Sequence, residues 1–375
     1  MRNIATLKLS DFEYQLPKEL IAQNALSERT DARLMVLDRS AHRTKHHQFH
    51  EIDSYLEKGD VLVLNDTKVI SARLFAKRKT GGRVEILFLK SLSFPHALSG
   101  NLDVDPRLKH SGMTAHETLE VLIKPSGKIK EGEELILDAA PHISIHVLDA
   151  PDHLTGIRHI HFTGSEKAES ILERYGRVPL PPYIEREDSE LDRELYQTVY
   201  ARKAGAVASP TAGLHFDEPL LKRLEAKGIE ILFVTLHVSL GTFQPVDAED
   251  LSQHKMYHEY FYLSDETAER INFAKSDGRR VIACGTTVVR ALESSATDSV
   301  PGEVKTNEGM TNIFIYPPYE FKIVDGLITN FHLPRTTLLM LVSAFAGHEF
   351  VMRAYQEAIQ NKYRFYSYGD AMLIV

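Results

Sequence analysis

The sequence predicts a large α/β domain interrupted by a small inserted β-barrel, and two patterns carry this prediction. Between about residues 67 and 160, short apolar runs alternate with glycine and proline turn signals and no helical pattern intervenes. Before residue 66 and again after residue 165, patterns typical of buried strands alternate along the chain with helical or polar segments. We therefore expect a discontinuous α/β domain of residues 1–66 and 161–375, with residues 67–160 as the inserted barrel.

The elements of the first two thirds follow from local signals. Strand patterns at 34–38 and 61–65 precede the insert. Within the insert, four apolar runs have the length and spacing of the strands of a small barrel, at 84–89, 119–123, 134–137 and 143–148. A helix is expected over 165–175, ending at Gly176. Another helix opens at Asp217, carries a first-turn proline and closes at Gly228. With strands at 204–208 and 229–238, this helix forms a predicted βαβ unit.

The last third continues the α/β alternation. A strand at 280–284 leads through a Gly285 turn into a helix over 287–294. A strand at 326–331 precedes a very apolar helix at 337–346, for which Thr336 is the predicted cap. A helix over 349–362 and a strand ending at 375 complete the chain. A short helix is also expected at 17–22, with Pro17 in its first position.

Composition limits the class of protein. The chain has 375 residues, of which 43% are hydrophobic and 26% charged, as in ordinary globular enzymes. Its one cysteine, Cys284, excludes an intramolecular disulfide and fits a reducing compartment. We find no signal-peptide pattern and no apolar run of membrane-spanning length, so a cytoplasmic protein is expected. The net charge of −8 argues against a general nucleic-acid coat protein but permits a local basic patch.

Polar residues follow five of the predicted strands. Ligands of α/β sheets bind beyond the carboxyl ends of strands, so the five segments together predict a polar crevice. Each one alone is equally consistent with simple helix capping. The segments are 65–68, 209–216, 237–243, 284–287 and 330–337.

Three side chains in these segments are candidates for acid–base chemistry. His215 and His237 lie where apolar runs turn polar, and an imidazole can act as base or acid near neutral pH. Asp66 could bind a ribose hydroxyl or accept a proton. The plainer interpretation is that both histidines are structural and that Asp66 bonds its own turn.

The turn at 285–287 is a candidate anion site, because a helix start exposes backbone N–H groups. A tight strand-to-helix turn is an equally good interpretation. The chain contains no Walker loop, no dinucleotide-binding glycine fingerprint and no nucleophile elbow. His254 and His258 have helical metal-ligand spacing, but their surroundings favour a strand, so we predict no metal site.

A basic stretch at the entry to the insert is a candidate phosphate-contact surface. Residues 68–83 contain six cations and no acid. A solvated strand face would explain the same pattern equally well. The six are Lys68, Arg73, Lys77, Arg78, Lys79 and Arg83.

In their order and number, the motifs of this chain resemble those of the S-adenosylmethionine:tRNA ribosyltransferase-isomerase family of queuosine biosynthesis. The resemblance runs nearly end to end. It departs from the family pattern at Ser239, where the family favours glycine, and at 257–258, where it favours His-Ser. The matching segments are 9–17, 65–69, 81–85, 176–184, 196–201, 209–216, 235–243, 284–290, 330–338 and 366–372.

The resemblance implies a fold and a reaction. The fold is an α/β domain interrupted by a β-barrel, in agreement with the strand patterns. The reaction transfers the ribosyl group of S-adenosylmethionine to the amine of 7-aminomethyl-7-deazaguanine at the tRNA wobble position and isomerises it to epoxyqueuosine, releasing adenine and methionine. S-adenosylmethionine is then a consumed co-substrate, no tightly bound cofactor is expected, and we expect a monomer.

The same resemblance gives the candidate residues roles. His215 is the leading base or acid, with Asp66 and His237 behind it. The basic stretch and Arg335 would meet tRNA phosphate. The expected substrate-binding residues are Thr211, Gly213, Gly241, Thr242, Gly285, Thr286, Thr287, Arg290, His332 and Arg335.

Two alternatives come from other classes of protein. A methyltransferase would move a methyl group to RNA and release S-adenosylhomocysteine, but no glycine-rich loop follows an early strand. A non-catalytic RNA-binding module would bind tRNA and consume nothing, and the acidic net charge argues against it.

Overall fold

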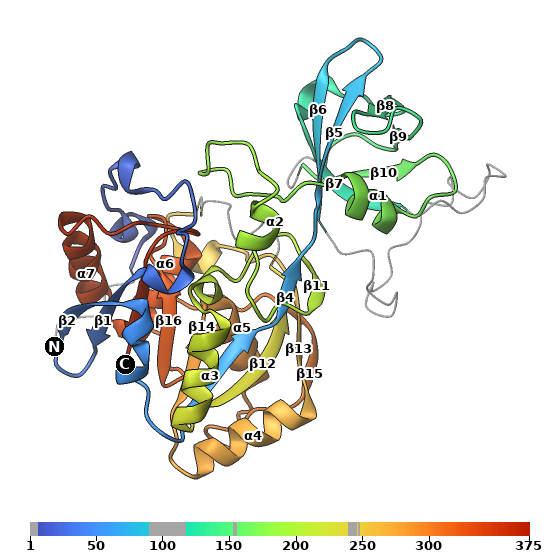
Figure 1. The fold of residues 1–375 in the computed structure, drawn as a ribbon. Coiled ribbons are helices and arrows are strands. Elements are labelled where there is room, and N and C mark those ends of the chain that lie inside the picture. Colours follow the sequence, from blue (N-terminus) through green and yellow to red (C-terminus); the bar gives the residue numbers. More distant parts are fainter. Residues whose placement is uncertain (1–6, 90–117, 153–155, 239–245, 247) are drawn as a thin grey trace.

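The larger part of the molecule is built on one nine-stranded sheet (Figure 1). The computed structural model describes residues 7–89, 118–152, 156–238, 246 and 248–375. In spatial order the strands are β15 (Asn307–Thr311), β13 (Glu259–Leu263), β12 (Glu230–Leu236), β3 (Val61–Asn65), β14 (Val281–Cys284), β16 (Gly326–Asn330), β17 (Ala371–Ile374), β1 (Arg33–Asp38) and β2 (Arg43–Gln48).

The centre of this sheet is parallel. β12, β3, β14 and β16 all run in one direction, so their carboxyl ends meet at one edge. Within this sheet, β12 follows β3 in the sequence and lies on one side of it. β14 lies on the other side of β3, and β16 lies beyond β14. The sheet therefore has a topological switch point between β3 and β14, which is where α/β sheets place their ligands.

Helices cover both faces of the sheet. Alternate residues of β3 point to opposite faces of the sheet. On one face, Val61 and Val63 belong to an apolar core that also contains residues of four helices. These helices are α4 (Asp265–Ser276), α5 (Thr286–Ser295), α6 (Thr337–Ala346) and α7 (His348–Gln360). Leu62 and Leu64 pack with α3 (Glu218–Lys227) on the other side. Burial on both faces explains the unbroken apolar runs of these strands.

The predicted helix ends are confirmed. The Asp217 carboxylate accepts a hydrogen bond from the Leu220 amide at the start of α3, and Gly228 closes that helix in the left-handed conformation, with φ of 88°. The Thr336 hydroxyl caps α6 in the same manner. At 17–22, however, the predicted helix is wrong, because only the short 3-10 turn Lys18–Leu20 forms before Ile21 bridges to Phe365.

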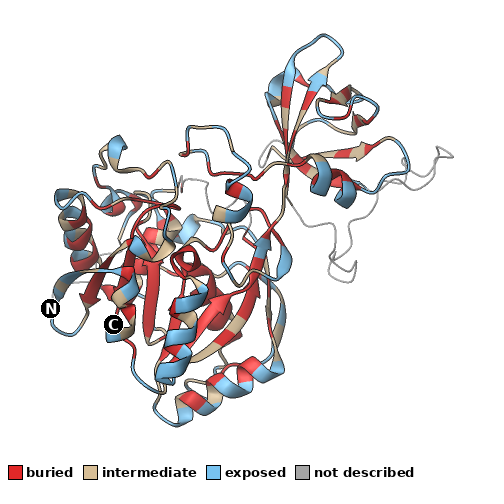
Figure 2. Cartoon of the chain, viewed as in Figure 1, coloured by how far each residue is buried: buried red, intermediate tan, exposed pale blue. Residues whose placement is uncertain are grey.

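The insert is a closed six-stranded antiparallel barrel, as predicted. Its inward residues form a separate apolar core, visible as the buried interior of the small domain in Figure 2. The alternation is clear in β7, where Leu119, Val121 and Ile123 are buried. The strand order is β10 (Arg158–Phe162), β7 (Leu119–Lys124), β6 (Arg83–Phe88), β5 (Arg73–Arg78), β8 (Glu134–Leu137) and β9 (Ser144–Val147).

A two-stranded ribbon of β4 (Thr67–Val69) and β11 (Lys203–Ala206) connects the barrel to the sheet (Figure 1). The prediction of a βαβ unit with β11 in the main sheet is therefore wrong, since the parallel neighbour of β12 is β3. Instead, β11 pairs with β4. Gly205 in β11 packs closely against the main sheet, because a Cβ there would lie 2.6 Å from the His237 ring.

Two short helices follow the barrel. They are α1 (Ala168–Tyr175), which ends at Gly176 as predicted, and α2 (Asp192–Leu195). In the described part of the chain, no helix combines the length and the apolar character needed to cross a membrane.

Candidate active site

A cavity lies at the carboxyl ends of β14 and β16, next to the switch point. Three of the five predicted polar segments contribute to it, and Val238 comes from a fourth. We call it the first cavity. Its lining residues are Tyr183, Ala208, Ser209, Pro210, Thr211, Ala212, Val238, Gly285, Thr286, Thr287, Thr329, Asn330, Phe331, His332, Leu333, Thr336, Leu338, Tyr366 and Ser367.

The start of α5 presents hydrogen-bond donors to the first cavity. Gly285 is the N-cap, with φ of 95° and no side chain to cap the helix. Within the described residues, no acceptor is found for the backbone N–H groups of Thr286 and Thr287. The Ser209 hydroxyl lines the same cavity, is buried, and also has no partner there. Such a set of donors at a helix N-terminus suits a carboxylate.

The start of α6 borders the same cavity, and one of its first-turn donors, the Leu339 amide, is capped by Thr336. Thr336 Oγ1 accepts from the Leu339 amide at 3.4 Å and donates to the Leu333 carbonyl at 2.7 Å. Beside it, His332 Nε2 lies 2.7 Å from Thr329 Oγ1, and burial lowers the His332 pKa to about 3. His332 is therefore a neutral group at physiological pH.

A second, smaller cavity lies beside the first. The two share Ser367. Its lining includes a histidine, a guanidinium and a tyrosine among apolar side chains. The residues are Ala25, Leu26, Arg29, Ala32, Leu195, Leu214, His215, Ser367, Tyr368 and Gly369.

His215 belongs to the second cavity and reaches the first through Asn330. It lies in the short 3-10 helix Thr211–His215, and its Nε2 is 3.3 Å from Asn330 Oδ1. Its ring packs on Phe49 at a centroid distance of 5.0 Å. Burial lowers the pKa of His215 to about 4, with further lowering by Arg364 and Arg29 and an opposing effect of Asn330. His215 is therefore neutral at pH 7 and can accept a proton.

The other two acid–base candidates lie at the base of the ribbon, outside the lining of both cavities. His237 Nδ1 is 2.7 Å from Thr67 Oγ1, and burial followed by the charge of Lys203 lowers the His237 pKa to about 4. Asp66 accepts a hydrogen bond of 2.6 Å from Thr235 and lies 3.4 Å from Arg202. Both therefore have structural partners here.

The predicted substrate-binding residues divide into three groups. Thr211, Gly285, Thr286, Thr287 and His332 line the first cavity. Gly241 and Thr242, like Ser239, lie outside the described residues. The remaining three lie near the cavity without lining it.

Each of those three has an identifiable environment. Arg290 forms a buried ion pair with Glu259 behind α5. Gly213 packs against Tyr200, whose hydroxyl would lie 2.0 Å from an added Cβ. Arg335 is exposed on the loop before α6, with φ of 58°, and its Nε is 3.8 Å from Glu13. A left-handed non-glycine residue costs about 1 kcal/mol or more, so this loop is held by its surroundings.

Five of the six cations of the basic stretch form ion pairs with acids from other segments of the chain. Only Lys68, exposed on β4, has no ion pair within the described residues. The sequence could not show this, because the partners come from elsewhere in the chain. The pairs are Arg73–Glu85, Lys77–Asp138, Arg78–Glu133, Lys79–Glu134 and Arg83–Glu187.

Several polar residues of the first cavity had no predicted individual role, among them Ser209, Asn330 and Ser367. The first two lie in predicted polar segments, so the signal was present, but only the fold gives them a cavity to face. Tyr366 has φ of 71°, which no sequence pattern reveals. Among the described residues, no cluster of three or more histidine, cysteine or acidic side chains could hold a metal.

The structure is an α/β fold with a barrel insert and two adjoining cavities, the first of which lies next to the switch point of the sheet. A family model for queuosine biosynthesis proteins matches residues 9–374. The chain belongs to this family.

Relatives of the same length share much of the sequence. A protein of Sulfurihydrogenibium sp. is 48% identical over 98% of this chain and all of the relative, and one of Legionella pneumophila is 46% identical over 97% and 99%. Both are named S-adenosylmethionine:tRNA ribosyltransferase-isomerase. The crystal structure of an S-adenosylmethionine tRNA ribosyltransferase from Thermotoga maritima is similar, with 36% identity, a TM-score of 0.51, and coverage of 97% of this chain and 100% of that one.

Proposed function

We propose that this protein transfers the ribosyl group of S-adenosylmethionine to 7-aminomethyl-7-deazaguanine at the tRNA wobble position and isomerises it, with adenine and methionine as the other products. Family membership and the shared length with relatives of that name support the reaction class. The observation that carries the proposal is the first cavity, whose donors suit the carboxylate of an amino-acid-bearing substrate.

The polar and apolar groups that line the first cavity support S-adenosylmethionine as its ligand. Thr286, Thr287 and Ser209 would hold the methionine carboxylate, because their donors are buried and without partners among the described residues. The aromatic and aliphatic walls, with Tyr183, Phe331 and Leu338, suit the adenine and ribose. Thr211, Gly285 and His332 would complete the binding site. Gly213, Gly241, Thr242, Arg290 and Arg335 are proposed supporting residues.

Catalysis requires removal of a proton from the ribose carbon beside the sulfonium, which acidifies it, and protonation of the departing adenine. His215 is our leading candidate, since it is neutral, buried and linked to the first cavity through Asn330. Asp66 and His237 are the other candidates. The tRNA backbone would meet Lys68, Arg73, Lys77, Arg78, Lys79 and Arg83.

The experiment that tests the function is product analysis. The purified protein is mixed with S-adenosylmethionine and tRNA carrying the aminomethyl-deazaguanine. We expect adenine and methionine to appear only with that tRNA, and the nucleoside to gain the mass of the ribosyl-derived group. Release of S-adenosylhomocysteine would instead identify a methyltransferase, and no consumption of S-adenosylmethionine would indicate a binding module.

The role of His215 is tested by His215→Ala. We expect loss of turnover by at least about a hundredfold, with the circular dichroism spectrum retained and tRNA binding reduced much less than turnover. His50→Ala, which changes an exposed histidine, serves as the control. Turnover like that of the unmodified protein in His215→Ala would remove His215 from the chemistry and turn attention to Asp66 and His237.

A further inference from the structure

We propose that the second cavity receives the deazaguanine base of the tRNA, while S-adenosylmethionine occupies the first. This inference rests on the proposed function and deepens it, since a two-substrate transfer needs two adjacent sites. The second cavity then selects a planar heterocycle that presents an N–H donor.

The two cavities meet at two residues. Ser367 lines both of them. Asn330 lines the first and lies 3.3 Å from His215, which lines the second. Ligands in the two cavities would therefore approach each other at Ser367 and Asn330. Such an approach is what transfer from one ligand to the other requires.

The hydrogen bonds of Asn330 determine which nitrogen of His215 is available. Asn330 Nδ2 donates to the carbonyls of Tyr366, at 2.8 Å, and Ser367, at 3.4 Å. Its Oδ1 must therefore accept, so His215 Nε2 carries the hydrogen. His215 Nδ1 is left with a lone pair and no partner among the described residues. It can accept from the lactam N–H or the amino group of a guanine-like base.

Charged side chains of both signs surround the second cavity. Arg29 lines the cavity, and both Arg29 and Arg364 disfavour a positive charge on His215. Glu194 and Asp217 interact with Arg29, and Asp370 with Arg364, so part of the guanidinium charge is offset. The transfer itself requires the aminomethyl group as the neutral amine, whose lone pair forms the nitrogen–carbon bond.

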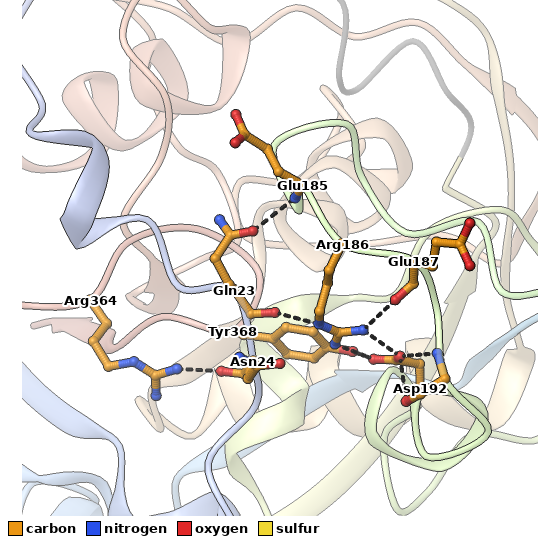
Figure 3. Close-up of polar contacts among 9 residues, drawn as sticks. Gln23, Asn24, Glu185, Arg186, Glu187, Asp192, Arg364 and Tyr368 are labelled. Atoms are coloured by element: carbon orange, nitrogen blue, oxygen red, sulfur yellow. Dashed lines mark hydrogen bonds and ion pairs between the residues drawn. The ribbon is translucent and has the colours of Figure 1, made fainter.

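A polar network holds Tyr368, which lines the second cavity (Figure 3). The Tyr368 hydroxyl donates to buried Asp192 at 2.8 Å, and Arg186 donates to both oxygens of Asp192 at 2.7 Å. Arg186 also donates to the Gln23 carbonyl at 2.9 Å. The network joins segments distant in sequence around one side of the cavity, so its shape is preorganised.

The test fills each cavity separately with the same substitution. Leu195→Phe enlarges a half-buried side chain in the second cavity, and Leu338→Phe does the same in the first. For Leu195→Phe we expect KM for the aminomethyl-deazaguanine tRNA to rise at least about tenfold, with the Kd of labelled S-adenosylmethionine, measured by equilibrium dialysis without tRNA, within about twofold. For Leu338→Phe the Kd for S-adenosylmethionine should rise.

Two outcomes would overturn the inference. One is a Kd for S-adenosylmethionine raised as much by Leu195→Phe as by Leu338→Phe, which would make the cavities one site. The other is an unchanged KM for tRNA in Leu195→Phe. If Leu195→Phe misfolds, Leu26→Phe repeats the test, because Leu26 also lines the second cavity but belongs to a different segment of the chain. The proposed function fails separately, through absence of turnover in the unmodified protein.

Discussion

At the scale of single residues, close packing next to the site leaves no space for a side chain at Gly213. Gly213 lies in the 3-10 helix that carries His215, and it packs under Tyr200 and Thr198. An added Cβ would be 2.0 Å from the Tyr200 hydroxyl and 2.8 Å from Thr198 Cγ2. A glycine is therefore required here by close packing, with no need for a special backbone conformation.

We predict that Gly213→Ala lowers the free energy of unfolding by about 1–3 kcal/mol through overpacking. Urea unfolding followed by circular dichroism measures this. Adding Tyr200→Phe should recover part of the loss, because it removes the nearest atom. Gly127→Ala, where nothing lies within 4 Å, is the control. Equal losses in the two alanine variants would contradict the packing explanation.

At the scale of elements, the two helices beside the first cavity differ in a way that matters for binding. In α6 the side chain of Thr336 caps the Leu339 amide, whereas α5 begins at Gly285, which has no side chain that could occupy the first-turn donors. Because Ser209 lines the same cavity as the start of α5, α5 and the segment after β11 would act together on a carboxylate.

We predict that Ser209→Ala raises the Kd for S-adenosylmethionine by about 10–150-fold, the loss of one hydrogen bond to a charged group. Equilibrium dialysis without tRNA measures it. Ser343→Ala is a matched control, since Ser343 in α6 is also a buried serine without a partner among the described residues but does not line the cavity. An unchanged Kd in Ser209→Ala would place the carboxylate elsewhere.

At the scale of the whole molecule, buried neutral histidines connect stability to pH. Burial lowers the pKa of His215 and His237 to about 4 and that of His332 to about 3. Their unfolded pKa is about 6.5, so between these values the unfolded chain binds more protons. The stabilisation is complete above about pH 6.5 and is lost as the pH falls toward 4.

We predict that, as the pH falls across this window, each of these histidines lowers the free energy of unfolding by about 1.4 kcal/mol per pH unit. Urea unfolding at pH 7, 6 and 5 measures the slope. His237→Asn should reduce the slope by about one proton, whereas His50→Asn, at an exposed site, should leave it unchanged. A pH-independent stability between 7 and 5 would show that the histidines titrate normally.

The distribution of charge leads to a prediction about tRNA. Lys68 has no ion pair within the described residues, whereas Lys77 lies 3.5 Å from Asp138. We predict that Lys68→Gln weakens tRNA binding and lowers the slope of log Kd against log salt by about 1. Lys77→Gln should change that slope less, because its charge is already compensated. A larger effect of Lys77→Gln would place the RNA along the barrel.

Much of the architecture follows from local physics and could be predicted. The α3 caps at Asp217 and Gly228, the Thr336 cap and four of the six barrel strands could be predicted because they depend on neighbours within a few residues. The ribbon could not, since β11 has the pattern of a sheet strand and its pairing with β4 depends on a segment far away in the sequence.

The sequence by itself determined most of the helices and central strands, the barrel insert and the polar strand ends, because periodicity, capping and turn chemistry act over short distances. Only the tertiary structure decided which polar residues share a cavity. It brought His215 next to Asn330, paired the barrel cations with acids from other segments, and formed two cavities that share Ser367. The reason is physical: burial, ion pairing and cavity shape depend on residues that meet only when distant segments pack together.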